Sequence, residues 1–517
     1  MSKRKARLLI IGLDGGDPEL MEKWVNEGKL PTFKKIIENG VFGRLKSTIP
    51  PVTLPAWPTF MTGKNPGKHG ITGFFLSKDE LSTSYNIKEK GFWEYLESYG
   101  LKSIILNMPA CYPPKKINGI LMSGFLTPQG VNPFNPPQVF NEVRKNVGDF
   151  LPDPPSEIIN NMHKPKYWKK LVENVKIRSR GFDYLMENYD YDLFVAVYGD
   201  PDTVGHRLWG KNNNSGILFI YKEVDVNLSK WIENFDCVFV MSDHGFGGMK
   251  KYIRINQILK EMGLLKRVKD EKAKRQGFFL RILKKFNITH ETVSKLAGYP
   301  IFTQMVKVLP VKELAKIIPS TTKIIDKENT KAYFTLYEGG RGIKVIEKNT
   351  NKKKQIMRLI KKKLLSLKDP ETGKNIIEAV YYRDEIYKGK GNIKAPELII
   401  SPSDGYNINP GFGPKAIADY PKEVGDHKQY GIFLAYGKNI KEHFEIDNAE
   451  LIDIAPTVVY TYGLKADTDF DGKILKNIFI KNPPPYKSAT GKRKISKNNE
   501  TEKEKASISE AVSRLKI

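Results

Sequence analysis

Residues 6–14 read ARLLIIGLD, a short apolar run that leads directly into the turn-forming sequence DGGDP. The apolar run is only about six residues long, shorter than the apolar region of a signal peptide. We therefore interpret it as a buried strand. Similar runs follow at LKSIILNMP (101–109), YDLFVAVYGD (191–200) and DCVFVMSDHG (236–245).

Amphipathic stretches separate these apolar runs, beginning with a predicted helix around Asp17 to Asn39. Continuous apolar strands that alternate with helical patterns are typical of parallel sheets covered on both faces. The sequence therefore predicts an α/β fold with a mostly parallel central sheet flanked by helices.

The composition of the 517 residues is that of a folded globular protein, with 40% hydrophobic and 28% charged residues. The two cysteines, Cys111 and Cys237, lie in apolar contexts, so we expect buried thiols rather than disulfides or a thiolate metal site. No apolar run approaches the roughly 18 residues that a spanning helix needs, so we predict no transmembrane segment and a cytoplasmic protein.

The net charge of +27, from 85 basic and 58 acidic residues, raises the question of an anionic partner. The lysines are spread along the chain and form no specific nucleic-acid motif. A solvated basic surface and an anionic substrate or surface both remain open interpretations.

The sequence divides into an interrupted core and two basic segments. The predicted parts are a catalytic core at 1–257 and 331–480, an inserted basic helical cap at 258–330, and a disordered basic tail at 481–517. Strand patterns resume after the cap, and LIDIAPTVVYTYGL (451–464) predicts a last packed helix. Within the cap, GFFLRILKKF (277–286) suits either packing on the core or peripheral membrane contact.

Aspartates and histidines, the residues that bind zinc and similar cations, follow the predicted strands. The candidate ligands are Asp14, Asp202, His206, Asp243, His244 and His427. The four-residue spacing of Asp202 and His206 places both on one face of a helix turn. Each fragment alone also fits a surface pair, a helix cap or a turn. Together they supply three ligands for each of two metal ions, and the crevice beyond the carboxyl ends of the strands can bring them together.

Thr53 is the candidate nucleophile in TIPPVTLPAWPTFMTGKNPGKHGI (48–71). Pro55 marks the first turn of a predicted helix, whose N-terminal N–H groups would face a phosphoryl group. Thr53 could instead only cap this helix. Thr48 and Thr59 are weaker candidates for the nucleophile.

The order of these motifs resembles the type I phosphodiesterase and nucleotide pyrophosphatase family of the alkaline phosphatase superfamily. The resemblance spans Asp14, TLPAWPTFMTGKNPGKHGI, PDTVGH, SDHG and GDH, ending at His427. It is nearest to the predicted prokaryotic phosphohydrolase branch, also marked by NGILMSGFLTP and DIAPTVVYTYGL. It implies an alkaline phosphatase-like core and cleavage of phosphodiesters or phosphomonoesters.

The resemblance also implies roles for single residues. Asp202, His206 and His427 would hold one divalent ion, while Asp14, Asp243 and His244 would hold a second that also binds the Thr53 oxygen. Zinc and manganese both suit these ligands. A phospho-threonine would form on Thr53 and then be hydrolysed by metal-activated water.

One position departs from the family pattern. Nucleotide pyrophosphatases have a phosphoryl-binding Asn shortly after the HGI segment, whereas Phe74 stands there in this chain. Another donor must stabilise the developing charge, and the Thr53 backbone N–H and the side chain of Asn107 are candidates.

Other functions are less well supported. GKNPGKHG is one residue short of a P-loop, and Thr53, Pro55 and Trp57 do not match the sulfatase pattern. A phosphotransferase or mutase on the same metal core stays open, as does a catalytically degraded binding protein for nucleic acid or membranes.

Overall fold

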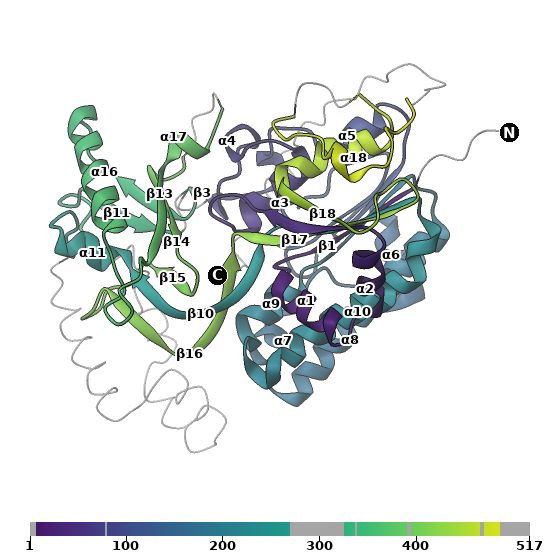
Figure 1. Ribbon diagram of the computed structural model, residues 1–517, viewed down its shortest axis with the longest axis horizontal. Coiled ribbons are helices and arrows are strands. Elements are labelled where there is room, and N and C mark those ends of the chain that lie inside the picture. The colour runs from purple at the N-terminus through teal and green to yellow at the C-terminus, as the bar shows by residue number, and fades with distance from the viewer. Residues whose placement is uncertain are drawn as a thin grey trace.

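The computed structural model describes residues 7–77, 80–268, 325–336, 339–389, 394–465 and 470–485. Within these residues a central sheet of nine strands forms the core (Figure 1). In spatial order the strands are β18 (Phe444–Glu450), β2 (Val41–Lys46), β17 (Tyr430–Gly437), β9 (Cys237–Ser242), β1 (Leu8–Leu13), β8 (Leu193–Tyr198), β5 (Ser103–Met108), β6 (Gly119–Ser123) and β7 (Phe134–Asn135).

The predicted mostly parallel sheet is confirmed. Only β17 and β7 run against the other seven of these strands. The predicted strand at the start of the chain is β1, which lies between β9 and β8. Because β1, β8 and β9 are parallel neighbours, their carboxyl ends meet at one edge of the sheet.

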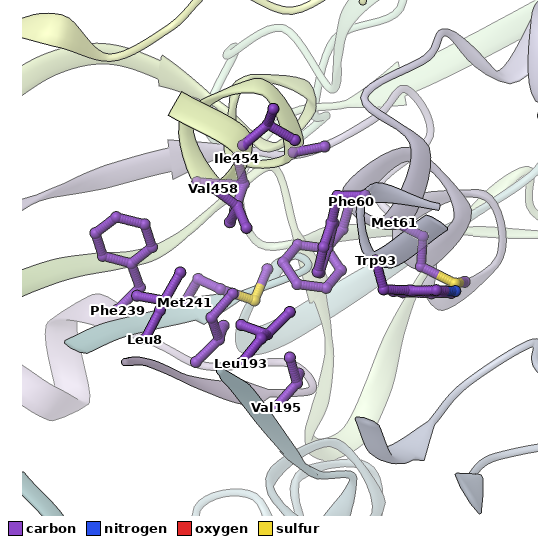
Figure 2. Packing of buried hydrophobic residues seen from close by; sticks show 14 of the residues in the cluster. Leu8, Phe60, Met61, Trp93, Leu193, Val195, Phe239, Met241, Ile454 and Val458 are labelled. Carbon is purple, nitrogen blue, oxygen red and sulfur yellow. The ribbon is translucent and has the colours of Figure 1, made fainter. Parts of the chain in front are cut away.

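Helices cover both faces of this sheet, as Figure 1 shows. On one face lie α3 (Thr53–Thr62), α5 (Phe92–Glu97) and α18 (Ile454–Thr461); on the other lie α1 (Pro18–Asn26), α2 (Pro31–Glu38), α6 (Gln138–Val147), α8 (Pro165–Asn188) and α10 (Ser215–Trp231). Successive residues of a strand point to opposite faces of the sheet. Leu8 lies in the same apolar cluster as Ile454 and Val458 of α18 (Figure 2), whereas Leu9 lies in the apolar cluster on the other face.

The predicted helix around Asp17 to Asn39 is two helices in the structure, α1 and α2. Gly28 adopts a φ of +70°, which glycine tolerates best, and Pro31 begins the second helix. These two residues break the helical pattern, while Asp17 caps α1 by accepting a hydrogen bond from the N–H of Leu20.

A second unit lies beside the core. It contains a three-stranded sheet of β15 (Tyr406–Asn409), β10 (Gly245–Arg254) and β16 (Ile417–Lys428), and a four-stranded sheet of β11 (Ala332–Thr335), β12 (Gly342–Val345), β14 (Leu398–Pro402) and β13 (Ile377–Tyr382). Its helices α11 (Ile255–Glu261) and α16 (Thr350–Leu365) pack in the same apolar cluster as these strands.

The second unit uses residues that the sequence analysis placed in the core. Of the segment 331–480, the strands β17 and β18 join the central sheet and the helix α18 packs on it, whereas β11 to β16 lie in the two separate sheets. Residues 269–324 of the predicted cap, including GFFLRILKKF, and residues 486–517 of the predicted tail lie outside the described residues. None of the helices described here is long and apolar enough to cross a membrane.

Shorter elements complete the described chain. They are α4 (Pro66–His69), α7 (Ser156–Asn161), α9 (Asp200–Leu208), α17 (Arg383–Ile386), β3 (Phe75–Ser77) and β4 (Glu80–Leu81), with short 3-10 turns at Ser84–Asn86, Lys211–Asn214, Ile232–Asn234, Leu451–Asp453 and Lys476–Ile478. Both cysteines, Cys111 and Cys237, are buried and unpaired.

Candidate active site

The six candidate ligands and Thr53 come together at the carboxyl edge of the central sheet. Asp14 follows β1, and Asp243 and His244 follow β9. Asp202 and His206 lie on α9, the helix that begins just after β8, and His427 lies near the end of β16. The predicted one-face arrangement of Asp202 and His206 is what α9 provides.

The first group consists of Asp202, His206 and His427. Asp202 Oδ1 lies 3.1 Å from His427 Nε2 and 3.2 Å from His206 Nε2, and the two Nε2 atoms are 3.0 Å apart. His206 Nδ1 lies 3.1 Å from the Gly425 carbonyl, to which it can donate, leaving the Nε2 lone pair facing Asp202 and His427. These three residues offer ligand atoms that are close enough to share one cation.

The second group surrounds Thr53. His244 Nε2 lies 3.5 Å from Asp14 Oδ1 and 3.4 Å from Asp243 Oδ2. The Thr53 hydroxyl is 3.4 Å from both Asp14 Oδ1 and His244 Nε2. Asp202 is also within ligand range of Asp14 and His244, so its carboxylate stands between the two groups.

Burial makes this site electrostatically costly without a cation. It raises the pKa of Asp14 and of Asp243 well above the usual range, and the neighbouring carboxylates add to the effect. Burial also lowers the pKa of His244 to about 3, and the neighbouring imidazole of His427 acts in the same direction. Burial alone would lower the pKa of His206, but the carboxylate of Asp202 outweighs it and raises that pKa to about 9.

These residues fit divalent cations. Asp243 Oδ2 is buried and has no hydrogen-bond partner among the residues that the structure describes. Three imidazole nitrogens and three carboxylates converge at short distances in the same buried or partly buried region. Such a set of N and O donors is typical of zinc or manganese sites, and cation binding would neutralise the clustered negative charge.

Thr53 is the nucleophile candidate best placed beside these ligands. It is buried at the first position of α3, where Leu54 interrupts the helical geometry. The two weaker candidates are engaged elsewhere: Thr48 donates to the Pro50 carbonyl at 3.0 Å, and Thr59 lies 3.0 Å from His69 Nε2.

Asn107 has a different environment from the one predicted. Its amide Nδ2 donates to the Val197 carbonyl at 2.9 Å, a contact between neighbouring strands of the sheet. Its Oδ1 is buried without a hydrogen-bond partner in the described ranges. An amide oxygen cannot donate to an anionic phosphoryl group, so a role for Asn107 in substrate binding stays a prediction.

The sequence analysis missed Trp57 as a residue of this site. Its indole N–H donates to Asp14 Oδ2 at 3.1 Å, and the ring is fully buried. A Cβ at Gly12 would lie only 2.6 Å from the Trp57 ring, so glycine in the strand makes room for the indole. A glycine within an otherwise apolar strand signals such a close approach, but the sequence does not reveal its partner.

The P-loop-like segment has its polar groups engaged with the protein. Asn65 Oδ1 accepts hydrogen bonds from the N–H groups of Gly67 and Lys388, and Asp471 accepts one from the Asn65 N–H. This segment therefore joins α3 to the second unit and to the C-terminal part of the described chain.

An α/β core with Asp and His side chains clustered at its strand ends is the arrangement of a metal-dependent hydrolase of the alkaline phosphatase superfamily. Residues 8–431 match the sequence model of type I phosphodiesterase / nucleotide pyrophosphatase, and the chain belongs to this family. It is therefore a phosphodiesterase/nucleotide pyrophosphatase-type hydrolase.

Solved structures similar to the chain include ectonucleotide pyrophosphatase / phosphodiesterase 5 from mouse and from human. The murine protein is 14% identical, with a TM-score of 0.49, 92% of this chain covered and 100% of that chain. An inactive variant of the murine protein in complex with AMP and the human protein each show 13% identity, the same coverage and the same TM-score. No curated protein sequence matches the chain.

Proposed function

We propose that the chain hydrolyses phosphodiesters or phosphomonoesters through a phospho-threonine on Thr53, with two divalent cations, zinc or manganese, held by the two ligand groups. The observation that carries this proposal is the position of the Thr53 hydroxyl, 3.4 Å from both Asp14 Oδ1 and His244 Nε2. A threonine that only capped α3 would have no need of a carboxylate and an imidazole beside its oxygen.

The first step is attack by Thr53 Oγ1 on phosphorus. The Oγ1–P bond forms as the bond from phosphorus to the leaving oxygen breaks, and the leaving alkoxide takes up a proton. Asp14 Oδ1 is the acceptor within reach of the Thr53 proton. The Trp57 N–H holds the other oxygen of Asp14 and so keeps Oδ1 turned toward Thr53.

The second step returns the enzyme to its starting state. Water attacks phosphorus, the P–Oγ1 bond breaks, and Thr53 regains its proton as phosphate or a phosphomonoester departs. Divalent cations, when bound, would neutralise charge on the phosphoryl oxygens and favour deprotonation of the attacking hydroxyl groups. His206 and His244 are oriented for this ligation, since each Nδ1 lies at a carbonyl oxygen, 3.1 and 2.9 Å away.

The test is hydrolysis of an aryl phosphodiester and an aryl phosphomonoester after chelation and reconstitution with zinc or manganese. We expect metal to restore turnover and Thr53→Ala to reduce kcat by at least about 1,000-fold, because the nucleophile is lost. Thr48→Ala is the matched control and should keep wild-type kcat, since the Thr48 hydroxyl donates to the Pro50 carbonyl and the hydrogen bond from Gln429 to the Thr48 carbonyl does not involve the side chain of Thr48.

Two further measurements make the outcome decisive. Rapid quenching of the wild-type reaction should trap phosphate on Thr53, and Thr53→Ser should retain a trappable phospho-enzyme. Turnover by Thr53→Ala at the wild-type rate would refute the covalent step, and wild-type turnover in the presence of excess chelator would refute the metal requirement.

A further inference from the structure

A cleft opens beside the candidate active site, between the core and the second unit. It is lined by residues of both parts, and part of it is open to solvent. One wall contains Pro50 and Pro51, which precede Thr53, and His427 lines the same cleft. The opposite wall contains Arg341 and Asn407 of the second unit.

The Gly339–Gly340 turn fixes the backbone beside Arg341 against the core. Thr72 Oγ1 donates to the Gly339 carbonyl at 2.8 Å, and the Gly339 N–H donates to the Phe75 carbonyl at 3.1 Å. A Cβ on Gly73 would lie 2.5 Å from Gly340 Cα, and Gly340 itself has a φ of +115°. Glycine at these positions permits the close approach. The turn thus joins the second unit to the segment that ends at Phe74, where the family pattern has its phosphoryl-binding Asn.

The Arg341 guanidinium connects to the metal-ligand region through side chains. Its Nη2 donates to Asn407 Oδ1, Asn407 Nδ2 donates to Asp426 Oδ2, and Asp426 Oδ1 accepts the His427 N–H at 2.8 Å. Arg341 also donates to the Ile408 carbonyl at 3.3 Å. These contacts hold the guanidinium in one orientation on the cleft wall.

The Arg341 charge is only partly compensated. Its Nε is buried and has no hydrogen-bond partner in the described portion of the chain. Asp426 also lines the cleft and interacts electrostatically with Arg341, but its oxygens accept hydrogen bonds from Asn407 and from the backbone of His427. The lining carboxylates Glu378 and Asp404 are solvent-exposed, and Lys428 adds a second basic side chain to the lining. An exposed carboxylate is screened by water more than a half-buried guanidinium is, so the inner wall of the cleft favours an anion.

We propose that this cleft receives the leaving group of the substrate and that Arg341 binds an anionic group, a carboxylate or a second phosphate, on that leaving group. The proposal rests on the proposed function, because it assumes that phosphorus is attacked at Thr53. It assigns the substrate class as phosphate esters whose departing alcohol carries its own negative charge. Arg341 is a specificity residue, and Asn407 positions it.

The test compares two chromogenic diesters that differ only in the leaving group. One is methyl 4-nitrophenyl phosphate, and the other is methyl 3-carboxy-4-nitrophenyl phosphate. We expect the wild type to favour the carboxylated ester, mainly through a lower KM. Arg341→Met should lower kcat/KM for the carboxylated ester about 10-fold more than for the neutral one, which is the effect of losing one charge-assisted hydrogen bond.

One charge-retaining variant and one control variant test whether this result is specific to the charge of Arg341. Arg341→Lys, which keeps the charge, should restore part of the preference. Arg358→Met, which removes an exposed arginine from α16, should leave both esters unaffected. If Arg341→Met lowers kcat/KM equally for both esters, the arginine acts on the reacting phosphoryl group and the leaving-group assignment is overturned.

A wild-type measurement covers the case in which Arg341→Met does not fold. The product 5-hydroxy-2-nitrobenzoate should inhibit hydrolysis of the neutral ester competitively, with an inhibition constant at least about 10-fold lower than that of 4-nitrophenol. Equal inhibition by the two phenols would overturn the proposal. Failure of the wild type to hydrolyse either ester would instead count against the proposed function itself.

Discussion

At the scale of single residues, we expect the hydrogen bond from the Trp57 N–H to Asp14 to contribute to metal affinity, although Trp57 itself is not a candidate ligand. Trp57→Phe keeps an aromatic ring in the core but removes the hydrogen bond to Asp14 Oδ2. We expect metal affinity to fall about 10-fold, the usual effect of losing a partner of a ligating carboxylate. Calorimetric titration of the metal-free protein with zinc measures this change.

A matched tryptophan serves as the control for this substitution. Trp93 lies in the same apolar cluster, and Trp93→Phe should leave metal affinity unchanged. Identical zinc affinity in Trp57→Phe and wild type would show that the hydrogen bond from the indole to Asp14 does not contribute to metal binding.

From the buried position of His69 we predict that the stability of the fold depends on pH, separately from the metal site. Its Nδ1 accepts the Ile71 N–H at 3.2 Å, so the proton of the neutral ring lies on Nε2, facing Thr59. Burial lowers the pKa of His69 to about 3. The unfolded chain has a His pKa near 6.5 and takes up the proton first as the pH falls, whereas the folded state does not.

The stabilisation by neutral His69 is therefore complete above about pH 6.5 and is lost as the pH falls toward about 3, at up to about 1.4 kcal/mol per pH unit. In His69→Gln the free energy of unfolding should decline less steeply between pH 6 and pH 4, as urea denaturation measures it. His443→Asn, at an exposed position, should decline as the wild type does. Parallel curves for all three proteins would contradict the prediction.

At the scale of elements, a buried ion pair joins α8 to the start of α9. Arg178 of α8 donates to Asp200 of α9, and both side chains are only 1% exposed. Arg178 Nε also donates to the Leu151 carbonyl at 3.3 Å. Because α9 carries Asp202 and His206, this pair holds the helix that presents two candidate ligands.

Arg178→Met should lower the free energy of unfolding by about 3 kcal/mol, since it leaves the Asp200 carboxylate buried without its partner. Loss of activity should accompany the loss of stability. Arg180→Met on the same helix is the control, because its pair with Glu173 is about half exposed and should contribute less than about 1 kcal/mol. Chemical denaturation of the two variants side by side checks both values.

The elements also show what the sequence could predict. Asp14, Asp202 and Asp243 were identified as neighbours because each follows a continuous apolar strand, and parallel strands end at a common edge. The contact between Arg341 and Asn407 was not predictable, since the two residues are 66 positions apart and lie at β12 and β15, which belong to different sheets of the second unit. The sequence also did not show which strands of 331–480 join the central sheet and which build the two smaller sheets, because short apolar strands do not reveal which sheet they join.

At the scale of the whole molecule, metal removal should affect stability as well as activity. The two ligand groups draw on β1, β9, α9 and β16, elements that are far apart in the sequence. A cation that binds only the folded state stabilises it by about 2.7 kcal/mol when its concentration is 100 times its dissociation constant. We expect chelation to lower the midpoint of thermal unfolding by several degrees and added zinc or manganese to restore it.

The location of this effect is also predictable. Loss of hydrogen-exchange protection on chelation should centre on α9 and on the end of β16, where Asp202, His206 and His427 lie. Asp202→Asn should shrink the difference between metal-loaded and chelated protein. A thermal midpoint that does not respond to chelator in the wild type would contradict a structural contribution from the metal.

The residues proposed for catalysis and those proposed for substrate specificity lie in different parts of the chain, which affects how its specificity can evolve. Six of the seven residues proposed for the chemistry lie on core elements, whereas Arg341 and Asn407 belong to the second unit. Mutations within 339–409 can therefore alter which ester is accepted while the hydrolytic residues are inherited intact. For protein engineering, this makes residues 339–409 a region in which new specificities can be selected while all seven residues proposed for the chemistry are kept.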